Sequence, residues 1–220
     1  MKFNLFSIWK KDKENCKKNV VEECSDVDKN NPLLISDDGK TLIKCIRDVV
    51  ECVIPNGVEV IAEEAFRGHQ ELISVTIPDS VIEIGGGAFQ GCGLRTVTLP
   101  DSITRLETRT FACCRQLEEI NLPESIETIC IEAFNSCESL QHLEIPSSVK
   151  EIEEYAISNC TRLQVVIINS FTVNIHNWAF YDCLQLVCIE TPFPMSFNMK
   201  HYKCSKYLHI ISKHSKGKLI

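Results

Sequence analysis

The sequence predicts a β-rich solenoid of the α/β class, built from short strands in repeats of 22–23 residues. The first observation is a row of prolines spaced 23, 22, 23 and 23 residues apart: Pro55, Pro78, Pro100, Pro123 and Pro146. The second is that Ala or Thr follows each proline position by ten residues, then Phe or Ile, and three residues later Cys or His. A unit of this length cannot bury its apolar side chains alone, so neighbouring units are expected to stack.

Residues 1–32 are predicted to form a flexible, charged N-terminal arm. They hold 7 Lys and 6 acidic residues, and residues 10–31 lack apolar periodicity. The apolar start is interrupted by Asn4 and Ser7 and has no cleavage site, so we predict no signal peptide. The sequence contains no run of 18 apolar residues, so no integral membrane segment is predicted. A cytoplasmic location is expected. A weak interfacial anchor is the alternative, formed by Phe3, Phe6, Ile8 and Trp9.

Residues 33–54 are predicted to form an N-terminal capping hairpin. Two short apolar runs, at 33–35 and 41–43, flank the segment Asp37-Asp38-Gly39-Lys40. Asp-Gly is typical of tight hairpin turns because its residues tolerate positive φ. Such a hairpin would cover the first coil of the solenoid.

Residues 55–192 are predicted to be the solenoid, with about six repeats. Alternating apolar residues before each proline indicate a strand with one buried face, as at Val75 and Ile77. Proline ends the strand because it lacks the N–H of a further ladder bond. The serines at Ser80, Ser102, Ser125 and Ser148 are expected to bond nearby backbone and hold the turn. A second short extended piece follows, and the Ala-Phe-x-x-Cys segment is predicted to be one helical or 3-10 turn.

Residues 193–220 are predicted to be a C-terminal cap and basic tail. The last 21 residues hold 6 Lys and no acid, whereas residues 33–199 hold 10 basic and 24 acidic residues. Tyr207, Leu208, Ile210 and Ile211 could form a final strand. The His and Cys residues of this tail match no zinc spacing, so no metal site is predicted.

The repeat consensus I-P-x-S-V-x-x-I-x-x-x-A-F-x-x-C-x-x-L resembles the BspA-type leucine-rich repeat over residues 49–192. The resemblance implies a right-handed leucine-rich-repeat solenoid with a parallel sheet on its concave side. It also implies a binding role, as in adhesins and interaction modules. The sequence departs from the pattern at Asn169, Ile157 and Thr172, which weakens the last repeats.

Five of the 13 cysteines occupy one repeat column: Cys92, Cys114, Cys137, Cys160 and Cys183. Side chains at matching places in stacked coils point in parallel, whereas a disulfide needs converging vectors. Free, buried thiols are therefore expected, which favours a reducing compartment; a disulfide ladder is the alternative.

The sequence predicts no enzyme and no cofactor. The segment Gly85-Gly86-Gly87 lacks the spacing of a phosphate loop and is interpreted as a turn. The sequence shows no catalytic arrangement of a nucleophile and a base. The net charge of −7 argues against nucleic-acid binding, which needs a basic surface.

The predicted binding surface is the concave sheet. Its outward residues change from polar to acidic to apolar along the array, which suits a protein or peptide partner. The candidate partner-binding residues are Arg95, Thr96, Thr98, Glu118, Glu119, Asn121, Gln141, His142, Glu144, Gln164, Val165 and Ile167. A non-enzymatic protein-interaction module is therefore predicted; the alternative is a cell-surface adhesin for host or extracellular proteins. The oligomeric state stays open.

Overall fold

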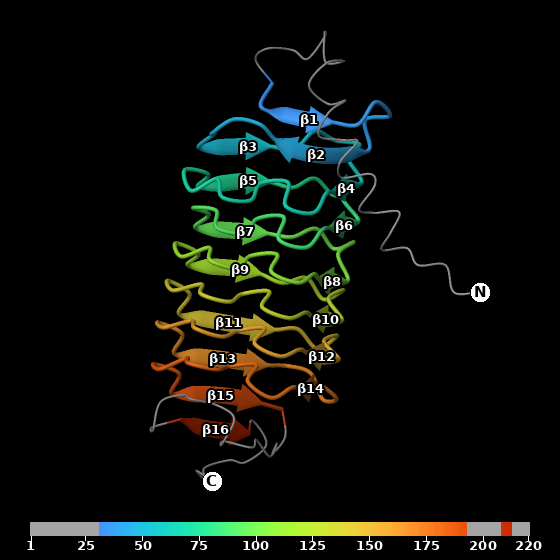
Figure 1. Cartoon of the computed structure of the whole chain (residues 1–220). Coiled ribbons are helices and arrows are strands. Elements are labelled where there is room, and N and C mark those ends of the chain that lie inside the picture. The colour runs from blue at the N-terminus through green and yellow to red at the C-terminus, as the bar shows by residue number, and fades with distance from the viewer. Residues whose placement is uncertain (1–30, 193–207, 213–220) are drawn as a thin grey trace, which may run out of the picture. The chain divides into compact units, whose positions relative to one another are not determined.

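Two columns of short parallel strands form a β-solenoid in the computed structural model, which describes residues 31–192 and 208–212 (Figure 1). The long-strand column consists of β3 (Glu51–Val53), β5 (Ser74–Thr76), β7 (Thr96–Thr98), β9 (Glu119–Asn121), β11 (His142–Ile145), β13 (Val165–Ile168), β15 (Cys188–Thr191) and β16 (His209–Ser212). The short-strand column consists of β4 (Val60–Ile61), β6 (Glu83–Ile84), β8 (Arg105–Leu106), β10 (Thr128–Ile129), β12 (Glu151–Ile152) and β14 (Asn174–Ile175). Each coil from β3 to β14 therefore contributes one strand to each column.

The register between neighbouring coils follows the repeat length. Leu143 of β11 pairs with Val166 of β13, and Val166 pairs with Ile189 of β15, so paired residues lie 23 positions apart. The continuous ladders are β3–β5, β7–β9 and β11–β13–β15–β16. Between β5 and β7, at the 22-residue unit, the Arg95 N–H donates to the Ile73 carbonyl at 3.2 Å. The predicted stacking of proline-marked units into one solenoid is confirmed.

A hairpin precedes the first coil. Strand β1 (Leu33–Ile35) is antiparallel to β2 (Thr41–Cys45), and β2 is parallel to β4. Gly39 has φ +73°, a conformation that the turn requires and that glycine adopts without steric cost. Strand β3, the first of the long-strand column, already lies within the segment 33–54 that the sequence assigns to the cap.

Some sequence predictions concern residues outside the described part. These are the flexible arm at residues 1–30 and the parts of the C-terminal segment at 193–207 and 213–220. At the C-terminal end, the described strand β16 pairs in parallel with β15, and Ile210 lies opposite Ile189.

The predicted helical or 3-10 turn of each repeat is not found in residues 31–192, where this segment is a run of tight turns. In the first unit, Glu64 has φ 57° and Gly68 has φ 81°, so left-handed residues four positions apart prevent a continuous helix. Turn bonds such as Arg67 N–H to the Glu64 carbonyl at 3.1 Å alternate with bonds to the next coil. The Phe66 N–H donates to the Ala88 carbonyl at 2.7 Å. In residues 64–69, every second backbone N–H therefore donates to a carbonyl of the next coil. In a helix these N–H groups would donate to carbonyls of the same segment.

Phenylalanines stack along the interior. The ring centroids of Phe66, Phe89, Phe111 and Phe134 are successively 5.2, 5.5 and 5.8 Å apart, and the interplanar angles are 12°, 3° and 7°. All four side chains are fully buried. Ile157 continues the column where the sequence lacks a phenylalanine, and it is also fully buried. The column forms one continuous core across the repeats, which explains why a single unit cannot fold alone.

Each cysteine of the repeat column bonds to the coil before it. The thiol of Cys92 donates to the Phe66 carbonyl at 3.0 Å, and the thiol of Cys114 donates to the Phe89 carbonyl at 3.0 Å. The same bond recurs from Cys137, Cys160 and Cys183 at 3.3, 3.2 and 2.9 Å. Cysteine is suited to this position because it is small and apolar and its S–H still donates to a buried carbonyl.

The serines after the prolines bond across coils and not within their own turn. The hydroxyl of Ser125 donates to the Ile103 carbonyl at 2.7 Å, and that of Ser148 donates to the Ile126 carbonyl at 2.7 Å. Ser80 and Ser102 make the same bond to Val58 and Val81. The predicted bond from each serine to the backbone is confirmed. The carbonyl that accepts it lies in the preceding coil, so its identity depends on how the coils stack.

Replacing Ser125 with alanine is expected to lower the free energy of unfolding by about 1 kcal/mol, because the Ile103 carbonyl loses its side-chain donor. Urea unfolding followed by circular dichroism measures the change. The matched control is Ser147→Ala, because Ser147 is exposed and its hydroxyl donates to the Glu124 carboxylate and to no buried carbonyl among the described residues. An equal loss of stability in both variants would contradict the cross-coil role.

Candidate functional site

The candidate site is the exposed face of the long-strand column, here called the strand face. Side chains alternate along each strand: in β9, Glu119 and Asn121 are exposed and Ile120 is buried. Because every strand keeps the same register, the exposed residues of successive coils line up into continuous rows. A binding partner would therefore meet several coils at once.

All twelve predicted site residues lie on or directly before the strands of this face. The register places Thr96 opposite Glu119, His142 opposite Val165, and Glu144 opposite Ile167. Four of them precede the strands and follow one another across neighbouring coils: Arg95, Glu118, Gln141 and Gln164. Val165 and Ile167 are half-buried and the other ten are exposed. The structure brings these residues onto one surface, and their role in binding stays a prediction.

The centre of the strand face is acidic, and part of its charge is unpaired. In the described part of the chain, neither Glu118 nor Glu119 forms an ion pair or a side-chain hydrogen bond. The Glu144 carboxylate accepts a bond from the Asn169 amide at 2.7 Å. Arg95 is the basic residue of this area. It contacts Glu118 through the backbone, where the Arg95 carbonyl accepts a hydrogen bond from the Glu118 N–H at 2.8 Å. These exposed carboxylates are available to a basic partner without first breaking an ion pair.

Apolar side chains lie at both ends of the strand face. At the C-terminal end, Val165 and Ile167 lie on β13, and Ile211 of β16 is 42% exposed; Glu190 of β15 lies between Ile167 and Ile211 in the register. At the N-terminal end, Val53 of β3 is 70% exposed. The sequence reasoning missed Val53 and Ile211, because it began the array at Pro55 and ended it at residue 192. The alternation Glu51-Cys52-Val53, just before Pro55, was the signal that could have found the first of them.

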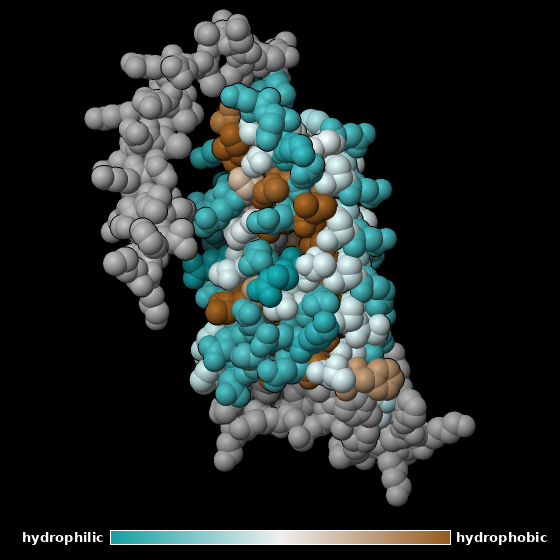
Figure 2. All heavy atoms as spheres, turned by 90° about the vertical axis from the view of Figure 1, so that its right-hand side faces the viewer, coloured by the Kyte–Doolittle hydropathy of each residue, from teal (hydrophilic) through white to brown (hydrophobic). Residues whose placement is uncertain are grey.

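Charges on the short-strand column are mostly paired, in contrast to the strand face. Lys40 pairs with Glu59 at 2.8 Å, and Lys150 pairs with Glu127 at 2.8 Å. Figure 2 views this side and shows hydrophilic residues with scattered hydrophobic ones among them. Such exposed pairs contribute little to stability, but they leave fewer free charges for a partner.

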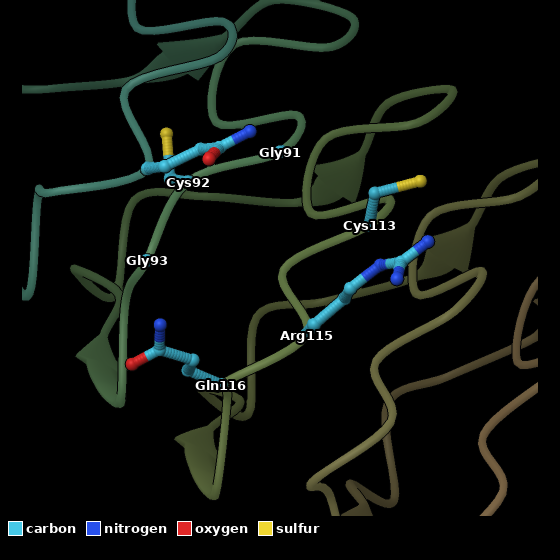
Figure 3. A pocket seen from close by; sticks show the side chains of 7 residues that line it. Gly91, Cys92, Gly93, Cys113, Arg115 and Gln116 are labelled. Carbon is cyan, nitrogen blue, oxygen red and sulfur yellow. The ribbon is translucent and has the colours of Figure 1, made fainter.

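A hollow of about 400 Å³, here called the notch, lies at the corner of the 22-residue unit. Other units place two residues between the Cys or His and the following Leu, whereas this unit has only Gly93 between Cys92 and Leu94. The shortened corner approaches the coil before it so closely that a Cβ on Gly93 would lie 1.9 Å from the Gln70 carbonyl oxygen. Figure 3 shows the corner and the next coil; the lining residues are Gln70, Gly91, Cys92, Gly93, Cys113, Arg115 and Gln116.

The thiols of the repeat-column cysteines are unreactive because they are buried. Burial raises the pKa of Cys114 to about 12, and it raises the pKa of Cys137 well above the ordinary 9.0. These thiols stay protonated at neutral pH and are poor nucleophiles and metal ligands. Among the described residues, no three His, Cys, Asp or Glu side chains converge as ligands of one metal ion.

The triple glycine serves the backbone, as the sequence interpretation states. A Cβ on Gly85 would lie 2.5 Å from the Glu63 nitrogen of the preceding coil, and Gly87 has φ +62°. Larger residues at Gly85 would push neighbouring coils apart. The segment therefore allows close packing of neighbouring coils.

Short parallel strands, columns of repeated buried residues and bonds between successive coils define a leucine-rich repeat protein. The chain belongs to the BspA-type leucine-rich repeat family, whose model matches six copies over residues 41–163 and 132–215. The resemblance inferred from the repeat consensus is thereby confirmed.

Solved structures of bacterial repeat proteins are similar to this chain. A leucine-rich cell surface protein from Faecalibacterium prausnitzii is 41% identical with a TM-score of 0.58; the match covers 62% of this chain and 37% of that one. A leucine-rich repeat protein from Eubacterium ventriosum is 20% identical with a TM-score of 0.61, covering 82% of this chain and 46% of that one, and it shows the fold alone. The chain thus spans less than half the length of either protein. A comparison with curated proteins gives no match.

In the residues that the structure describes, no helix has the length and apolar character needed to cross a membrane.

Proposed function

We propose that the protein is a non-enzymatic interaction module that binds a protein or peptide partner through the strand face. The observation that carries the proposal is one exposed surface on which unpaired carboxylates, Glu118 and Glu119, lie between apolar ends. Protein interfaces combine apolar area with charges that set orientation and partner choice. The family supports a repeat module of this kind, but fold alone does not assign a partner.

A double substitution on the strand face tests this function. Glu119→Lys combined with Glu144→Lys is expected to weaken partner binding about tenfold or more, because two attractive carboxylates become repulsive cations. The measurement is a pull-down with the full chain, followed by titration of any recovered partner. The matched control is Glu83→Lys combined with Glu154→Lys, which changes the charge equally at exposed positions outside the strand face. Equal recovery of every partner by both variants would contradict the proposal.

The compartment is also a proposal. The ten cysteines of the described residues are free, and several of them donate to buried carbonyls, which supports a reducing, cytoplasmic setting.

A cell-surface adhesin is the second candidate function. It is favoured by the 41% identity to the Faecalibacterium prausnitzii protein, which is described as a leucine-rich cell surface protein. Protease treatment of intact cells that express the chain distinguishes the two candidates. Degradation of the chain by protease while the cells stay intact supports display at the cell surface. Full protection of the chain from protease supports the intracellular module.

A further inference from the structure

We propose that the notch is a binding site for a carboxylate group carried by a peptide. It is separate from the strand face, and the inference does not depend on binding there. The notch arises from the one-residue shortening at Gly93, and its volume of about 400 Å³ lies within the range of ligand sites.

The side chains around the notch are those that recognise a carboxylate. Arg115, Gln70 and Gln116 line it, with the Arg115 side chain extending toward Cys113 (Figure 3), and none of the seven lining residues is acidic. This is unusual for residues 33–199, which hold 24 acidic and 10 basic side chains. Arginine presents a planar set of donors that matches the two oxygens of a carboxylate.

The Arg115 guanidinium forms only a weak ion pair within the described part of the chain. Its Nε lies 3.4 Å from the Glu138 carboxylate, and the two side chains are 68% and 42% exposed. An exposed ion pair of this length contributes little, so a ligand can compete for the guanidinium. In residues 31–192 and 208–212, the Gln70 and Gln116 amides make no side-chain hydrogen bond, which leaves both as donors.

The size of the notch favours a peptide over a small free acid. A carboxylate alone occupies a small part of 400 Å³, whereas an extended segment of about three residues fills it. The carboxylate can belong to an acidic side chain or to the end of a chain, and the two sources share the same recognition chemistry.

Three short peptides test the proposal on the full chain. The probes are acetyl-Gly-Asp-Gly-amide, acetyl-Gly-Gly-Gly with a free carboxyl end, and the neutral acetyl-Gly-Asn-Gly-amide. Nuclear magnetic resonance follows the amide signals of Gly91 and Gly93 and the Nε–H signal of Arg115. We expect saturable shifts with at least one charged peptide, and about tenfold weaker binding of the neutral one. The charged peptide that binds identifies the source of the carboxylate.

Substitutions separate the site from non-specific binding. Arg115→Gln is expected to weaken binding about tenfold or more, whereas Glu138→Gln strengthens it about two- to fivefold by removing the competing carboxylate. The matched control, Arg162→Gln, removes an exposed arginine from the corner of a 23-residue unit and leaves binding unchanged. Replacing Gly93 with Ser-Ala restores the common repeat length and is expected to abolish binding. Gln70→Glu, at an exposed position, provides the repulsive variant if the longer corner does not fold.

Three results would overturn the carboxylate site. They are equal binding of the neutral peptide, unchanged binding by Arg115→Gln, and no saturable shift with either charged peptide.

Discussion

The free energy of unfolding is expected to fall steeply as the pH rises above 9. Burial raises the pKa of Cys114 to about 12 and that of Cys52 to about 11, and it raises the pKa of Cys137 well above its ordinary value. In the unfolded chain, thiols titrate near 9.0. Above that pH the unfolded state loses protons that the folded state retains, so the folded state becomes less stable.

The size of this effect comes from the number of buried thiols. Each contributes a loss of about 1.4 kcal/mol per pH unit between its unfolded and folded pKa. Below pH 9 both states are protonated, and the stability is fully present. Several column cysteines acting together would remove much of the 5–15 kcal/mol that holds a typical domain, within about two pH units.

Urea unfolding between pH 8 and 10 measures the slope. Tyrosines and lysines, with ordinary pKa values of about 10 and 10.4, begin to titrate in the upper part of this range, so the effect of the thiols is taken from the comparison with a cysteine variant. The variant Cys114→Ala loses one titrating thiol, so its slope is expected to be smaller by about 0.7 kcal/mol per pH unit near pH 9, where half of the unfolded thiols are ionised, and by up to about 1.4 kcal/mol per pH unit near pH 10. A comparison at pH 7 separates this change from the cavity that the substitution leaves. A slope that stays flat up to pH 10 in the unsubstituted chain would mean that the thiols are not buried as described.

Replacing Phe111 with alanine is expected to lower the free energy of unfolding by about 3–5 kcal/mol. Phe111 is fully buried between Phe89 and Phe134, with ring centroids 5.5 and 5.8 Å away. Truncation leaves a cavity on both sides and removes two stacking contacts. Because each coil supports its neighbours, the loss affects the centre of the array.

The control for this cavity is Phe111→Ile. The chain itself places Ile157 in the same column, fully buried, so the backbone accepts an aliphatic side chain there. We expect a loss of about 1–2 kcal/mol for this variant, measured by the same urea titration. Equal stability of the alanine variant and the unsubstituted chain would contradict a continuous core.

The repeat columns made the fold predictable from the sequence. Alternation around Ile120 and Leu143 identified the buried and exposed sides of each strand, and the structure places both residues in the core. The tight turns could not be foreseen, because Glu132 and Ser136 adopt φ 56° and 61° although their residue types do not require it. Bonds between coils impose this conformation, and they exist only after stacking.

The candidate surfaces were predictable to different degrees. The rows of the strand face follow from the period of two along each strand, which the sequence shows directly. The notch does not, although the shortened unit at Gly93 is visible in the sequence. Its lining includes Gln70 and Arg115, which lie in neighbouring coils and approach Gly93 only through the stacking of the chain.

The regular hydrogen bonding between coils also determines which duplications, insertions and deletions the repeat array can accept during evolution. The Cys114 thiol and the Ser125 hydroxyl each reach a carbonyl of the coil before, and every 23-residue unit offers the same carbonyls. A duplicated unit would find its partners in place, so the array can lengthen by whole units without a new fold. Deletion of a single residue is tolerated at the corner near Gly93, where it leaves the cysteine and serine ladders intact. Insertions and deletions at such corners can therefore diversify the surface while selection maintains the interior.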